Sequence, residues 1–229
     1  MFKSREQAAE LLALRLGALR GQNPLVLGIP RGAVVMACVI ARELRGEVDL
    51  ALVHKLRAPQ QPELAIGAVD EAGNVALEFF AAETGATERY VQSERDTQLT
   101  ILRARRAAYT PARSAIDPRG RAVIVVDDGV ATGATMAAAL RSVREKQPAW
   151  LIAAAAVASE EAVERLGRLA SQVVVLEIPV EMDAVSLWFE RFPQVDDAEV
   201  VALLRAAEAK HGEPDAAAGT ADPRPKPHE

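Results

Sequence analysis

The chain has 229 residues, of which half are hydrophobic and 26% are charged, enough to build one sizeable hydrophobic core. The formal net charge of −5 argues against a general nucleic-acid-binding protein, because such proteins usually present a basic face. The single cysteine, Cys38, excludes a disulfide framework within the chain and a zinc site built from cysteines.

The first half of the sequence predicts alternating helices and strands. Ser4 and Gln7 form a capping-box pattern, and a periodic apolar helix follows to about Leu19. Further along we expect a strand at 24–29, a helix at 33–46, a strand at 48–56, a polar segment at 57–63 and a hairpin at 64–79.

The second half continues the alternation. We expect helices at 87–109, 135–145 and 160–170, and strands at 121–128, 150–158 and 172–178. Strands that are apolar on both sides and alternate with helices indicate an α/β fold with a largely parallel central sheet flanked by helices. In such sheets, ligands bind at the carboxyl ends of the strands.

The C-terminal part predicts additions to this core. The segment 180–209 is typical of short helices or loops, and 210–229 is rich in proline, alanine and charge. We therefore expect one domain over 1–209 and a disordered tail over 210–229. The N-terminus lacks the apolar core of a signal peptide, and the apolar run at 149–159 is too short to span a bilayer. These features predict a soluble, cytoplasmic protein without a membrane partner.

The most informative stretch is "VIVVDDGVATGAT", residues 123–135. Asp127 and Asp128 end a buried strand, where two charges are unfavourable unless a partner satisfies them. Neighbouring strand residues point to opposite sides, so one can meet a ligand while the other meets a metal ion or a basic side chain. The glycine- and threonine-rich loop before the next helix is suited to bind phosphate. The alternative is structural: the aspartates, with Thr132 or Thr135, cap that helix.

This motif resembles the phosphoribosyl pyrophosphate (PRPP) signature of type I phosphoribosyltransferases. The resemblance implies that Asp127 and Asp128 bind the ribose 2′- and 3′-hydroxyls of PRPP, and Mg²⁺ either directly or through water. It implies that the 5′-phosphate is bound by Ala131, Thr132, Gly133, Ala134 and Thr135. It also implies the type I phosphoribosyltransferase-like fold with a small hood at about 180–209, to which the N-terminus can contribute.

Two further segments extend the resemblance. In "LGIPRGAVV" (27–35), Arg31 and Gly32 match the loop that binds pyrophosphate in the family, although a plain turn with a solvated arginine is the alternative. The segment "HKLRAPQQPELAIGAV" (54–69) resembles the mobile catalytic loop that closes over PRPP. Lys55 and Arg57 are then candidates to neutralise the leaving pyrophosphate, and Glu63 to position the loop or a ligand.

A closer resemblance, over roughly residues 2–205, is to a group of stand-alone phosphoribosyltransferase-like proteins whose acceptor is not assigned. In the 6-oxopurine transferases, an aspartate near the base nitrogen occupies the position of Ala131. Its absence here argues against hypoxanthine or guanine. Trp188 and Phe189 are candidates to stack on an acceptor in the hood, with core packing as the alternative.

The sequence therefore predicts a cytoplasmic transferase of nucleotide metabolism that uses PRPP and Mg²⁺. It would transfer the phosphoribosyl group to a nitrogen acceptor, such as a nucleobase, and release pyrophosphate. Two alternatives stay open: a non-catalytic regulator that senses PRPP or nucleotides, and a hydrolase that uses water as the acceptor. The negative charge disfavours a regulator that binds nucleic acid. A homodimer is compatible with all three.

Overall fold

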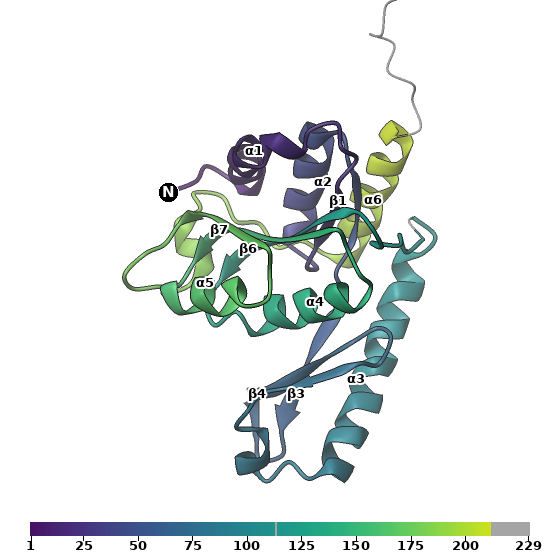
Figure 1. Ribbon diagram of the computed structural model, residues 1–229, viewed down its shortest axis with the longest axis vertical. Coiled ribbons are helices and arrows are strands. Elements are labelled where there is room, and N and C mark those ends of the chain that lie inside the picture. The colour runs from purple at the N-terminus through teal and green to yellow at the C-terminus, as the bar shows by residue number, and fades with distance from the viewer. Residues whose placement is uncertain (113, 212–229) are drawn as a thin grey trace, which may run out of the picture.

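The computed structural model describes residues 1–112 and 114–211, and its centre is a five-stranded parallel sheet (Figure 1). The strand order is β2-β1-β6-β7-β8. The strands are β1 (Leu25–Gly28), β2 (Glu47–Leu50), β6 (Ala122–Val130), β7 (Trp150–Ala158) and β8 (Gln172–Glu177). All four neighbouring pairs are parallel, so the predicted α/β fold with a parallel central sheet is confirmed.

Helices cover both faces of this sheet (Figure 1). One face is covered by α1 (Arg5–Arg15), α2 (Ala33–Leu44) and α6 (Asp197–His211), and the other by α4 (Ala134–Glu145) and α5 (Glu160–Gly167). Alternate strand residues contribute to two separate hydrophobic clusters: Val26 and Ile124 to the first, and Leu25 and Val123 to the second. The strands are apolar on both sides because both faces are buried.

The helices that follow β1 and β6 lie on opposite faces of the sheet. These strands are parallel neighbours, with Gly28 opposite Val126. After β1 the chain enters α2 on one face of the sheet, whereas after β6 it enters α4 on the other. The two loops therefore diverge and leave a crevice at the carboxyl ends of the strands, which is the usual ligand site in open α/β sheets.

A second unit, here called the arm (residues 53–109), projects from this core (Figure 1). It consists of the antiparallel strands β3 (Val53–Ala58), β4 (Gln61–Asp70) and β5 (Val75–Leu77), the short 3₁₀ helix η2 (Ala81–Thr84), and the long helix α3 (Glu88–Tyr109) packed on β3 and β4.

The arm corrects two sequence predictions. The single strand predicted at 48–56 is two strands, because the chain leaves the main sheet after Leu50 and joins the antiparallel sheet at Val53. The predicted polar segment 57–63 is not a loop, since strand pairing continues almost to the turn at Pro59 and Gln60. The proline-rich composition hid a hairpin there.

The ends of the chain also differ in detail from the predictions. Ser4 caps α1 by accepting a hydrogen bond from the Gln7 N–H, but the α-helix ends at Arg15 and the short 3₁₀ helix η1 (Gly17–Leu19) follows. The segment 180–209 holds the 3₁₀ helix η3 (Val185–Trp188) and most of the 15-residue helix α6, which is longer than predicted. Residues 212–229 of the predicted tail lie outside the described residues. Among the described helices, none has the length and apolar character needed to cross a membrane.

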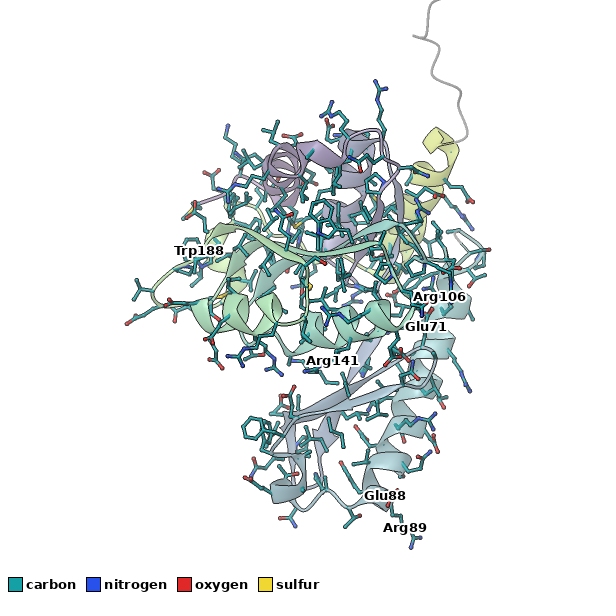
Figure 2. The ribbon with its side chains drawn as sticks, viewed as in Figure 1. Glu71, Glu88, Arg89, Arg106, Arg141 and Trp188 are labelled. Carbon is teal, nitrogen blue, oxygen red and sulfur yellow. The ribbon has the colours of Figure 1, made fainter. Side chains whose placement is uncertain are left out.

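A buried ion pair fastens the arm to the main sheet. The guanidinium of Arg106 on α3 lies 3.1 Å from Asp49 of β2 and 2.9 Å from Glu71 in the β4–β5 turn. Figure 2 shows Glu71 and Arg106 together where the arm meets the core. Asp49 is only 2% exposed, and its second oxygen accepts a hydrogen bond from the Ile116 N–H (2.9 Å).

Replacing Arg106 by methionine would leave Asp49 buried without its cation. We expect the free energy of unfolding to fall by about 3 kcal/mol, because a buried charge that loses its partner is strongly destabilising. Urea unfolding measures this loss. Arg103→Met is the matched control, since Arg103 lies on the same helix, is exposed and forms no ion pair within the described residues. Equal stability of the two variants would contradict this role of Arg106.

Candidate active site

The crevice between β1 and β6 brings together the two loops that the sequence singled out. Residues 30–32 follow β1, and residues 131–133 link β6 to α4. The peptide bond between Pro30 and Arg31 is cis, and the Arg31 side chain is exposed. A β-carbon on Gly32 would lie 2.6 Å from the Asp128 Oδ2 atom, so the glycine permits close contact between the two loops.

Asp128 points toward the α1 side of the sheet and is paired with a residue that the sequence interpretation missed. The Arg5 Nε atom donates to Asp128 Oδ2 at 2.9 Å. Arg5 is only 6% exposed, its guanidinium carbon lies 3.6 Å from the centre of the Phe192 ring, and its Nη1 donates to the Pro193 carbonyl at 2.7 Å. One oxygen of Asp128 is thus held by the protein, while Oδ1 has no donor among the described residues.

Asp127 precedes Asp128 on β6, and the two carboxyl groups interact with each other. Its Oδ1 atom accepts a hydrogen bond from the backbone N–H of Asp128 at 2.9 Å. Burial, followed by the neighbouring negative charge of Asp128, raises the pKa of Asp127 well above its ordinary value, and the positive charge of Arg5 acts in the opposite direction. Asp127 is therefore the member of the pair whose negative charge is unfavourable, while Arg5 supplies a positive charge directly to Asp128.

The loop before α4 has the form of an anion cradle. Gly133 precedes the helix with a φ of 74°, a left-handed conformation that favours glycine. On the side of α5, Ser159 Oγ donates to the Ala131 carbonyl at 2.6 Å, and Arg165 Nη1 donates to the Thr132 carbonyl at 3.4 Å. Across a trans peptide, the C=O and the next N–H point in opposite directions. The N–H groups of Thr132 and Gly133 therefore face away from α5, and no acceptor for them is found in the described part of the chain.

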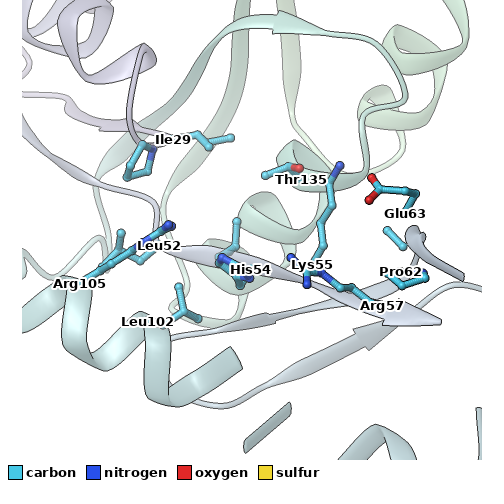
Figure 3. Close-up of a pocket in the computed structure, with 13 residues that line it drawn as sticks. Ile29, Leu52, His54, Lys55, Arg57, Pro62, Glu63, Leu102, Arg105 and Thr135 are labelled. Atoms are coloured by element: carbon cyan, nitrogen blue, oxygen red, sulfur yellow. The ribbon is translucent and has the colours of Figure 1, made fainter. Parts of the chain in front are cut away.

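A cavity of about 320 Å³ lies between these loops and the arm (Figure 3). Its walls include the predicted residues Lys55, Arg57, Glu63 and Thr135, together with Pro30 beside Arg31. Figure 3 shows the Lys55 side chain extending from the hairpin toward Thr135 at the start of α4. Asp127, Asp128 and Arg31 are outside the lining of this cavity, although they belong to the loops that border it.

His54 also lines the cavity, at the start of the hairpin. Burial lowers the pKa of its imidazole, and the positive charges of Arg105 and Arg57 lower it further. Its Nδ1 atom is buried without a hydrogen-bond partner in the described structure. The His54 imidazole is therefore neutral at pH 7. It lines the cavity beside the basic side chains of Lys55, Arg57 and Arg105.

The aromatic residues proposed for the hood pack against the N-terminus. The Phe189 side chain is 6% exposed, and its ring centre lies 5.5 Å from that of Phe2 and 5.0 Å from that of Phe192. The backbone N–H of Phe2 donates to the Trp188 carbonyl at 2.8 Å. Phe189 thus belongs to the hydrophobic core, whereas Trp188 is half-buried; contact of either with an acceptor remains a prediction.

Among the described residues, no group of three or more histidine, cysteine, aspartate or glutamate side chains could hold a metal ion. The Asp127–Asp128 pair nevertheless fits Mg²⁺ that arrives with a phosphate ligand, because Mg²⁺ is usually bound by one or two carboxylates and substrate phosphates and keeps several waters.

Arg5 was missed in the sequence analysis because nothing in the residue pattern of α1 indicates that this side chain reaches the end of β6.

Comparison with known proteins identifies similar sequences and a similar structure. Residues 3–193 match the family model of the phosphoribosyl transferase domain. Two provisionally named phosphoribosyl transferases of Mycobacterium tuberculosis, from strains CDC 1551 and H37Rv, are each 36% identical over 97% of this chain. The chain spans about half the length of these relatives (51%).

A solved structure of a similar protein has the same fold as this chain. The crystal structure of the protein TT1426 from Thermus thermophilus is 43% identical, with a TM-score of 0.81 over 90% of this chain and 98% of that one. Because the family model spans most of the sequence, this chain belongs to the phosphoribosyl transferase domain family.

Proposed function

We propose that the protein transfers the phosphoribosyl group of PRPP to a nitrogen acceptor, with Mg²⁺, and releases pyrophosphate. One observation carries this proposal: a carboxylate pair and an anion cradle lie near the end of the same strand, and a cavity lined by Lys55 and Arg57 reaches Thr135 at the start of the following helix. A sugar between two phosphate groups is the ligand that matches this order. Membership of the family supports the same donor.

The donor would lie across the crevice between β1 and β6. The free N–H groups of Thr132 and Gly133, with Ala131, Ala134 and Thr135, would bind the 5′-phosphate at the start of α4. Asp127 and the unengaged oxygen of Asp128 would accept hydrogen bonds from the ribose hydroxyls. This leaves the anomeric carbon between the Asp pair and the cationic cavity.

The reaction then breaks the bond between the anomeric carbon and a pyrophosphate oxygen, and forms a bond from the acceptor nitrogen, which loses its proton. The chain's contribution is to orient the donor and stabilise the charge on pyrophosphate through Arg31, the Gly32 backbone, Lys55 and Arg57. Asp127 and Asp128 would hold Mg²⁺, which would supply a further positive charge to stabilise the leaving pyrophosphate when bound. Glu63 lines the same cavity and would position the hairpin loop or the ligand.

The residue at position 131 argues for an acceptor other than a 6-oxopurine. Ala131 cannot take a proton from a base, and its carbonyl is held by Ser159. His54 supplies a neutral imidazole to the cavity lining, but it lies on β3 of the arm rather than on the loop that holds Ala131. We therefore propose a nucleobase or related nitrogen compound outside that class.

The test is a screen of nucleobases and other nitrogen compounds that follows pyrophosphate release from PRPP and Mg²⁺. Release that depends on one acceptor is the expected result. Release without any acceptor would instead identify a hydrolase, and PRPP binding without release would identify a sensor. Absence of PRPP binding would reject all three functions.

Asp128→Asn is expected to raise the Kd for PRPP by roughly 10- to 100-fold, because hydrogen bonds to a charged acceptor contribute about 1.5–3 kcal/mol. Isothermal titration with PRPP and Mg²⁺ measures the change. Asp117→Asn is the matched control, since Asp117 is exposed in the loop that precedes β6, whereas the crevice lies at the other end of that strand. An unchanged Kd in the Asp128 variant would contradict the ribose assignment.

Gly32→Ala tests the contact between the two loops. The backbone of Gly32 has a φ of −57°, which alanine adopts, so the variant should fold. Its methyl group would displace Asp128 and Arg5, and we expect the Kd for PRPP to rise about tenfold. Gly17→Ala is the control, because a β-carbon there meets nothing within 4 Å. Equal PRPP affinity in both variants, by the same titration, would refute the coupling.

A further inference from the structure

We propose that Arg105, on the arm helix α3, binds the pyrophosphate group of the donor as a third cation beside Lys55 and Arg57. The inference rests on the proposed function for the identity of the donor. No motif in the sequence indicated Arg105, because it lies in a helix rich in arginines, and only the folded arm places it at the cavity.

The first support is the face of α3 on which Arg105 lies. Leu102 and Arg105 are three residues apart, share one face of the helix and both line the cavity. Arg106, one position further, turns instead to Asp49 and Glu71 and is occupied in fastening the arm. Arg105 is exposed and has no ion pair or hydrogen bond within the described residues, so its charge is available to a ligand.

The second support is the position of Arg105 relative to the loop after β1. Figure 3 shows Arg105 at one end of the cavity, near Ile29 and Leu52, and Lys55 with Thr135 toward the other. The next residues, Pro30 and Arg31, begin the loop proposed for pyrophosphate. Arg105 and Arg31 also act on the same hydroxyl: both positive charges lower the pKa of Tyr109, which burial and its 2.6 Å hydrogen bond to Asp197 raise to about 12. Both guanidinium groups therefore lie close enough to act on the Tyr109 hydroxyl, Arg105 from α3 and Arg31 from the loop after β1.

The third support is the charge of the cavity. The cavity lining holds three basic side chains, Lys55, Arg57 and Arg105, against one carboxylate, Glu63, in a protein whose formal net charge is −5. His54, which also lines the cavity, is neutral and does not offset these positive charges. Cations gathered without partners repel one another, and a polyanion relieves that repulsion. Pyrophosphate offers enough oxygens for all three, and an arginine fork is suited to grip two of them.

The experiment titrates the full chain with inorganic pyrophosphate and Mg²⁺, and separately with ribose 5-phosphate, which lacks the pyrophosphate. We expect Arg105→Met to raise the Kd for pyrophosphate by roughly 10- to 100-fold and to leave the Kd for ribose 5-phosphate within about twofold. Arg105→Lys should recover part of the loss, because it keeps the charge but not the fork. Arg103→Met, on the same helix but outside the cavity lining, should match the wild type for both ligands.

The other outcomes overturn the inference in distinguishable ways. Pyrophosphate affinity of Arg105→Met equal to that of Arg103→Met would remove Arg105 from the site while leaving the proposed function intact. An equal loss for both ligands would assign Arg105 a structural role. A wild-type protein that binds neither pyrophosphate nor PRPP would overturn the proposed function together with the inference.

Discussion

The ion pair between Arg5 and Asp128 is the interaction on which the arrangement of the site depends. Two adjacent carboxylates at the end of a buried strand are unfavourable unless one receives a counter-charge. Arg5 supplies it from α1, and the same guanidinium stacks on Phe192 and binds the Pro193 carbonyl. It thereby joins the N-terminal helix, the end of β6 and the segment after η3, and it packs against Gly32 of the neighbouring loop.

The arm is the second element that shapes the site, and contacts on both sides of it join it to the core. Arg106 binds Asp49 and Glu71 on one side. On the other, Ser142 of α4 donates to Asp70 at 2.7 Å, and Arg165 of α5 binds Glu78 as well as the carbonyl of Thr132. The helix that begins at the anion cradle therefore also supports the hairpin that carries Lys55, so the two ends of a bound donor would contact connected parts of the structure.

Much of the fold and part of the site could be predicted from local patterns. Apolar strands alternating with helices predicted the parallel sheet, and the Asp127–Thr135 stretch predicted a strand, loop and helix in the observed order. The hairpin at 53–70 was obscured because its polar, proline-containing turn has the composition of a loop. The ion pair of Arg5 and the position of Arg105 at the cavity were missed for a different reason: both depend on segments distant in sequence, and an arginine on a helix carries no local sign of what it will meet.

The most direct test of the central claim is a crystal structure of the protein with PRPP and Mg²⁺. The account predicts the 5′-phosphate on the N–H groups of Thr132 and Gly133, the ribose hydroxyls on Asp127 and Asp128, and the pyrophosphate in the cavity beside Lys55. PRPP bound with its sugar away from the two aspartates, or with its 5′-phosphate outside the 131–135 loop, would contradict it.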